Sequence, residues 1–129
     1  MPSNSFVPKP TEGELAILQV LWRGGSGTVR DVVEKLSPTP GYTTALKMMQ
    51  IMAEKGLLSR DDSQRIHVYS PGIPQAETQR QLVSDLLRRA FGGSASELVL
   101  QALSTTRASK KDLETVRKLL ASIDGGSKS

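Results

Sequence analysis

Four polar side chains near the middle of the chain have the types and the spacing to bind nucleic acid. They are Thr43, Thr44, Lys47 and Gln50. Hydroxyl, ammonium and amide groups donate hydrogen bonds to phosphates and to base edges in the major groove. Ala45, Met49 and Met52 recur between them at intervals of four and three residues, which places an apolar row on another side of a helix. We therefore predict a recognition helix between Gly41 and Gly56.

Four further residues are candidates for contacts to DNA on either side of this helix. Thr28 and Arg30 stand at the start of the preceding predicted helix, where free backbone N–H groups favour a phosphate. Arg60 and Arg65 flank a polar turn after the recognition helix, from which an arginine could reach an adjacent phosphate. Asp61 and Asp62 in the same turn are interpreted as solvated carboxylates.

Two shorter helices are predicted ahead of the recognition helix. Thr11 and Glu14 have the spacing of a capping box. Leu15, Leu18 and Trp22 then recur as an apolar stripe, with Ile17 and Leu21 beside them, up to the glycine-rich segment 24–27. The segment 28–36 repeats the pattern, with Thr28 and Asp31 as the cap and with apolar residues at Val29, Val32, Val33 and Leu36. Two short helices around a tight break have the spacing of a helix-turn-helix.

A β-hairpin is predicted directly after the recognition helix. Residues 57–60 and 66–70 have strand character and flank the polar turn 61–65. A hairpin in this position is the wing of a winged helix. His67, the single histidine, lies on this hairpin and is a poor candidate for a metal ligand or a catalytic group.

The C-terminal part is predicted to be helical and to mediate dimerisation. Helices are expected over 78–91, 94–103 and 109–123, after a boundary at Pro71–Pro74. Their apolar faces are wider than these helices can hide against one another, and a twofold dimer commonly buries such a surplus. The residues predicted to lie in the dimer interface are Leu82, Leu86, Leu87, Phe91, Leu98, Leu103, Leu113, Val116, Leu120 and Ile123.

This pattern defines the expected fold class and domain organisation. The fold is mainly α with a small β-hairpin: a winged helix-turn-helix domain over 11–72 and a helical dimerisation region over 73–124. Residues 1–10 are expected to be a disordered lead, and residues 125–129 a flexible tail.

Composition limits the function further. The 129 residues include no cysteine, so disulfides and thiolate metal sites are excluded, and we expect no cofactor. The chain shows neither a signal pattern nor an apolar run long enough for a membrane span, which predicts a cytoplasmic protein without membrane insertion. The net charge is +4, yet residues 1–74 hold eight basic and seven acidic side chains. The DNA argument therefore depends on where the basic groups lie.

The order of these motifs resembles the penicillinase-repressor family, the BlaI/MecI/CopY group. The resemblance rests on TEGELAILQVLW, TVRDVVEKL, YTTALKMMQIMAEKGLL and HVYSP, and it extends over about residues 10–123. It implies an N-terminal winged helix that binds operator DNA, with the recognition positions on Thr43, Thr44 and Lys47, and a C-terminal region that dimerises. Family members repress β-lactam resistance genes or related operons, and several are cleaved after a membrane sensor metalloprotease detects a β-lactam.

Two departures from the family pattern concern regulation. Staphylococcal members are cleaved at an Asn–Phe bond in the middle C-terminal helix, where this chain has Gln101–Ala102. Copper-responsive members carry a cysteine motif, so copper sensing through that motif is excluded here.

We therefore expect a homodimeric, sequence-specific transcriptional repressor of a β-lactamase or β-lactam-response operon, which occupies a pseudo-palindromic operator and is relieved by proteolysis. The alternative is a winged-helix interaction module whose recognition helix docks a partner protein. An enzymatic function has no supporting motif, since the nearest glycine-rich stretch lacks the residues that cradle a phosphate.

Overall fold

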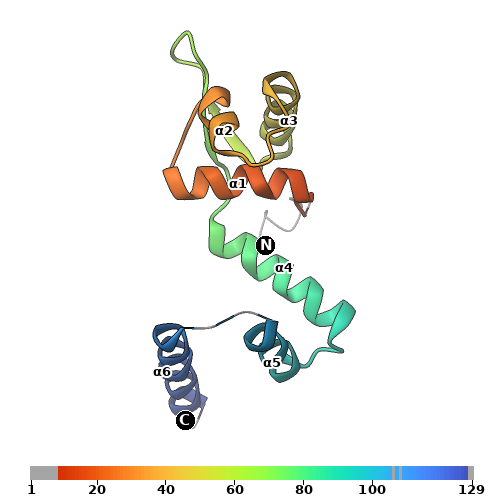
Figure 1. The fold of residues 1–129 in the computed structure, drawn as a ribbon, viewed down its shortest axis with the longest axis vertical. Coiled ribbons are helices and arrows are strands. Elements are labelled where there is room, and N and C mark those ends of the chain that lie inside the picture. Colours follow the sequence, from red (N-terminus) through yellow and green to blue (C-terminus); the bar gives the residue numbers. More distant parts are fainter. Residues whose placement is uncertain (1–8, 106, 108, 128–129) are drawn as a thin grey trace. The chain divides into compact units, whose positions relative to one another are not determined.

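The computed structural model describes residues 9–105, 107 and 109–127, and gives only the backbone course for 124–127. Within these residues the chain forms six helices and one two-stranded antiparallel hairpin (Figure 1), which confirms the predicted fold class. It divides into two compact units, the first ending at Val83 and the second beginning at Ser84. The first unit contains α1 Glu12–Gly24, α2 Val29–Lys35, α3 Tyr42–Lys55, β1 Leu58–Asp61 and β2 Val68–Pro71.

Capping boxes start the first two helices, as predicted. In α1 the Thr11 hydroxyl accepts from the Glu14 N–H at 3.2 Å, while the Glu14 carboxylate accepts from the Thr11 N–H at 3.0 Å. In α2 the same exchange joins Thr28 and Asp31 at 3.1 and 3.0 Å. Each box satisfies backbone donors that have no partner within the helix, so the sequence defines where both helices begin.

The buried face of α1 differs slightly from the predicted stripe. Ile17, Leu18 and Leu21 are almost completely buried, whereas Leu15 and Trp22 are only half-buried. The core contact of α1 is therefore made by the middle of the predicted apolar face, and Leu15 and Trp22 lie at its edges. Trp22 lies at the edge of the core, where its indole N–H donates to the carbonyl of Ile73 at 3.1 Å. An indole that is partly exposed to solvent and whose N–H has a hydrogen-bond partner is typical of the edge of a core.

The recognition helix α3 is held by the predicted apolar row. Ala45, Met49 and Met52 are each 0% exposed and pack into the core with residues of α1, α2 and the hairpin. Gly56 ends the helix in a left-handed conformation with φ of 90°, which glycine adopts without steric cost. Because one face is locked into the core, the opposite face of α3 is held out to solvent.

The hairpin is anchored at both ends by close backbone contacts. Tyr69 of β2 exchanges two 2.8 Å hydrogen bonds with Gly27 of the α1–α2 connection, and its ring is buried. At the base, the Gly72 N–H donates to the Leu57 carbonyl at 2.9 Å. A β-carbon on Gly72 would lie 2.6 Å from the carbonyl oxygen of Gly56, so this approach requires glycine.

The first compact unit extends beyond the boundary that was expected after Gly72. Helix α4, Gln75–Ala90, begins in this unit, where Ile73 and Thr78 are buried. The unit boundary therefore falls inside α4, because the start of this helix packs with the winged helix. The expected N-terminal lead lies mostly outside the described residues, but Pro10, which is described, is buried.

The second compact unit contains the end of α4 together with α5, Ala95–Thr105, and α6, Lys110–Ser127. Gly92 and Gly93 have positive φ after α4, and the Gly93 N–H donates to the Leu87 carbonyl at 2.9 Å. Helix α6 continues through Gly125 and Gly126 to Ser127, beyond the start of the expected tail. Among the described residues, no helix is long and apolar enough to cross a membrane.

Candidate nucleic-acid interface

The exposed face of α3 carries a straight row of polar side chains. Thr43, Lys47, Gln50 and Glu54 follow one another at intervals of four, three and four residues, and all four are exposed. This spacing places them on one side of the helix, opposite the buried row. Thr44 is also exposed, on a neighbouring side. The face presents donors over its first three turns and a carboxylate at its end.

Two surface hollows lie between α3 and the hairpin, and they differ in charge. We call the first the basic hollow. It has a volume of about 370 Å³ and is lined by Thr28, Val29, Arg30, Tyr42, Leu46, Arg65, Ile66, His67 and Tyr69. Within the part of the chain that the structure describes, two arginines and no carboxylate contribute to this lining. The structure thus brings three predicted DNA contacts, Thr28, Arg30 and Arg65, to one place beside the start of α3.

Thr28 has two functions in this hollow. Its hydroxyl oxygen caps α2 by accepting from the Asp31 N–H, while its own O–H remains able to donate to a phosphate. Hydrogen bonds from the backbone and side chain of Thr28 lower the pKa of Asp31 below its ordinary value. Asp31 therefore stays ionised and the cap stays formed at neutral pH.

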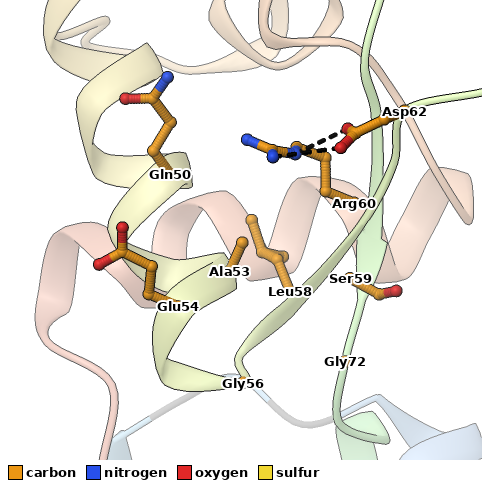
Figure 2. A pocket seen from close by; sticks show the side chains of 9 residues that line it. All are labelled: Gln50, Ala53, Glu54, Gly56, Leu58, Ser59, Arg60, Asp62 and Gly72. Carbon is orange, nitrogen blue, oxygen red and sulfur yellow. Dashed lines mark hydrogen bonds and ion pairs between the residues drawn. The ribbon is translucent and has the colours of Figure 1, made fainter. Parts of the chain in front are cut away.

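The second hollow, which we call the mixed hollow, lies beside the end of α3. It has a volume of about 750 Å³ and is lined by Gln50, Ala53, Glu54, Gly56, Leu58, Ser59, Arg60, Asp62 and Gly72. Figure 2 shows the Arg60 side chain reaching from β1 toward α3, with two contacts to Asp62. Arg60 Nε lies 2.7 Å from Asp62 Oδ1, and Arg60 Nη2 lies 3.2 Å from Asp62 Oδ2. The lining of this hollow therefore contains two carboxylates and one guanidinium, and Asp62 is the carboxylate that binds it.

The pairing of Asp62 adds to the sequence interpretation of the turn. Asp62 is exposed, as expected of a solvated carboxylate, but it also binds Arg60 and lies 3.8 Å from His67 Nε2. The neighbouring Tyr69 hydroxyl and the Asp62 carboxylate both raise the pKa of Arg60 above its ordinary value. Asp62 lies just beyond the end of β1, so the periodicity of a strand does not by itself predict this pair. Asp61, on the other side, accepts from the Ser63 N–H at 2.9 Å, which lowers its pKa.

An ion pair fixes α3 to the start of α1. Lys55 Nζ, at the end of α3, lies 2.8 Å from Glu14 Oε2, and the Glu14 side chain is 8% exposed. Burial alone would raise the pKa of Glu14, but hydrogen bonds from Lys55 and from the Thr11 N–H outweigh burial and lower it. Glu14 is therefore ionised at neutral pH and holds the recognition helix against α1.

The arrangement of three helices and a two-stranded hairpin is that of a winged helix-turn-helix. A family model described as penicillinase repressor matches residues 10–122, and the chain belongs to this family. It is 24% identical to the penicillinase repressor of Bacillus licheniformis over 116 residues, which cover 88% of this chain and 91% of the relative. It is 29% identical to the transcriptional regulator BlaI of Mycobacterium tuberculosis over 116 residues, which cover 88% and 83% of the two chains.

One solved structure similar to the chain includes DNA. It is the solution structure of monomeric Bacillus licheniformis BlaI in complex with the blaP half-operator, with 27% identity and a TM-score of 0.47. The match covers 55% of this chain and 89% of that one.

Proposed function

We propose that the protein represses a β-lactamase or β-lactam-response operon in the cytoplasm, by occupying a pseudo-palindromic operator as a homodimer. The observation that carries this proposal is the polar row on α3 beside the basic hollow. Thr43, Lys47 and Gln50 enter the major groove, and Thr44 lies at the edge of the contact. A helix in this position reaches base edges while neighbouring cations hold the phosphates.

The basic hollow supplies the phosphate contacts in this proposal. Arg30 and Arg65 approach it from α2 and from the wing, so they can hold the backbone on both sides of the start of α3. Such contacts position the protein on the duplex without reading sequence. Gln50 then contributes the discrimination between sequences, and Lys47, on the same helix, adds a phosphate contact.

The apolar residues of the C-terminal helices support dimerisation. All ten predicted interface residues are exposed or half-buried in the single chain, and Leu120 and Ile123 of α6 are 58% and 60% exposed. Leu113, Val116, Leu120 and Ile123 recur at intervals of three and four, which aligns them on one face of α6. A second copy of the chain would bury this face and present two recognition helices to successive half-sites.

Relief of repression is proposed to follow proteolysis by a membrane sensor metalloprotease. Gln101 and Ala102, which replace the Asn–Phe bond of the staphylococcal pattern, are exposed on α5. Mass spectrometry of the protein recovered from β-lactam-treated cells would locate the cut. An intact chain in fully induced cells would exclude this route.

The proposed function is tested by fluorescence anisotropy on the duplex upstream of the protein's own gene, compared with a scrambled duplex at two salt concentrations. We expect tighter, salt-sensitive binding to the native duplex. Genome-wide selection of the DNA fragments that the protein binds would detect an operator located elsewhere in the genome. If neither assay finds a preferred sequence, repression is refuted and the docking of a partner protein by α3 becomes the better explanation.

A further inference from the structure

The two hollows beside α3 separate the three arginines of this face into two groups. In the basic hollow, Arg30 and Arg65 line the surface and no described carboxylate lies among the lining residues. In the mixed hollow, Arg60 is accompanied by Asp62 and Glu54, so carboxylates outnumber the guanidinium. A polyanion is attracted to the first region and repelled from the second, because local charge directs its approach.

The geometry of the pair further restricts Arg60. Both Asp62 oxygens contact the guanidinium, at 2.7 and 3.2 Å, in the two-point arrangement that a phosphate would otherwise adopt. Asp62 is only two residues away along the chain and is therefore always within reach. A phosphate that approached Arg60 would have to replace this partner, in a hollow that Glu54 also lines.

We propose that Asp62 withholds Arg60 from the DNA backbone and thereby limits the affinity of the wing for DNA. This inference rests on the proposed DNA-binding function. It assigns the phosphate contact of the wing to Arg65 and makes Asp62 a residue that sets affinity without touching DNA. A moderate affinity suits a repressor that has to leave its operator.

The neighbouring Asp61 offers a matched control. Asp61→Asn and Asp62→Asn each remove one negative charge from adjacent positions of the wing, but only Asp62→Asn removes the charge and one of the two oxygens that bind Arg60. The asparagine oxygen at position 61 can still accept from the Ser63 N–H. Both variants should fold, since exposed ion pairs contribute little to stability. Far-UV circular dichroism and Trp22 fluorescence would verify this.

The experiment measures the affinity of the full-length protein for its operator duplex by anisotropy over a range of salt. Each additional phosphate contact steepens the slope of log K against log salt by about 0.9. We expect Asp62→Asn to bind more tightly than Asp61→Asn and to have a slope steeper by this amount. Its affinity should accordingly fall about 3.5-fold more than that of Asp61→Asn between roughly 50 and 200 mM salt.

A double-mutant cycle identifies the arginine responsible. Arg60→Ala should leave the salt slope of the wild type unchanged. In the Asp62→Asn background it should abolish both the tighter binding and the steeper salt slope. The inference is overturned if Asp62→Asn binds no better than Asp61→Asn, or if Arg60→Ala alone flattens the slope by about 0.9. The second result would mean that Arg60 contacts phosphate while it remains paired.

Failure of this inference can be distinguished from failure of the proposed function. Lys47→Ala is measured in the same series. If Lys47→Ala weakens operator binding while Asp62→Asn has no effect, the DNA-binding face stands and the role of Asp62 is refuted. If the wild type binds no duplex in a salt-dependent manner, both are refuted.

Discussion

The ion pair between Glu14 and Lys55 makes a specific prediction about the attachment of the recognition helix. Glu14→Gln keeps a side-chain oxygen that can accept from the Thr11 N–H, but removes the charge that faces Lys55. A hydrogen bond to a charged group contributes about 1.5–3 kcal/mol, and an exposed ion pair at most about 1 kcal/mol. The Lys55 side chain is 35% exposed. We therefore expect the free energy of unfolding to fall by about 1 kcal/mol at neutral pH.

The sign of the pH dependence follows from the lowered pKa of Glu14. In the unfolded chain this carboxyl titrates near its ordinary value of 4.5, and in the folded protein it titrates below that value. The stabilisation is complete above pH 4.5 and is lost as the pH falls through the folded pKa. The difference in stability between the wild type and Glu14→Gln should therefore shrink in acid.

Urea unfolding at pH 7 and pH 3, followed by Trp22 fluorescence, provides the assay. Trp22 is the single tryptophan and lies at the edge of the core of the first compact unit, so its signal reports on that unit. Lys55→Gln and the double variant complete a cycle, and we expect positive coupling between the two sites. The reasoning would be refuted if the difference in stability between the wild type and Glu14→Gln stayed constant or widened at pH 3. It would also be refuted if the double-mutant cycle showed no coupling between Glu14 and Lys55.

Three further changes test other parts of the structure. Lys47→Ala should weaken operator binding and flatten the salt slope by about 0.9, and an unchanged slope in anisotropy would remove Lys47 from the phosphate contacts. Leu120→Asp should shift the protein toward monomer in sedimentation and weaken operator binding, and a variant that stays dimeric at low concentration would place the interface elsewhere. Gly72→Ala should lower the free energy of unfolding by about 1–3 kcal/mol, because its β-carbon would lie 2.6 Å from the Gly56 carbonyl oxygen. Gly24→Ala is the control, since its β-carbon would meet only Lys35 Nζ at 4.0 Å, and equal losses would contradict the steric argument.

Much of the first compact unit could be predicted from the sequence because its signals are local. The Thr11–Glu14 and Thr28–Asp31 boxes operate within one helical turn, and the buried row of α3 follows directly from helical periodicity. The hairpin was also predicted, in the correct position. Its inward-facing residue was not, since the Tyr69 ring is buried through pairing with Gly27, forty-two residues earlier in the chain.

The candidate interface was predicted residue by residue but not as two regions of different charge. Arg60 and Arg65 appeared equivalent in the sequence, as two cations flanking one turn. In the structure Arg65 joins Arg30 in the basic hollow, while Arg60 is paired with Asp62. Which arginine remains available depends on the path of the hairpin and on its position against α3, and neither is a local property.

The sequence by itself determined where the helices begin, which side of α3 is apolar and which polar groups that helix offers to DNA. Caps and periodicity act over three or four residues, so they are encoded wherever the residues stand. The tertiary structure alone decided the attachment of α3 through Glu14 and Lys55, the contact of Trp22 with Ile73, and the extension of the first unit into α4. These contacts join residues 41 and 51 positions apart in the first two cases, and only the packing of whole elements brings such residues together.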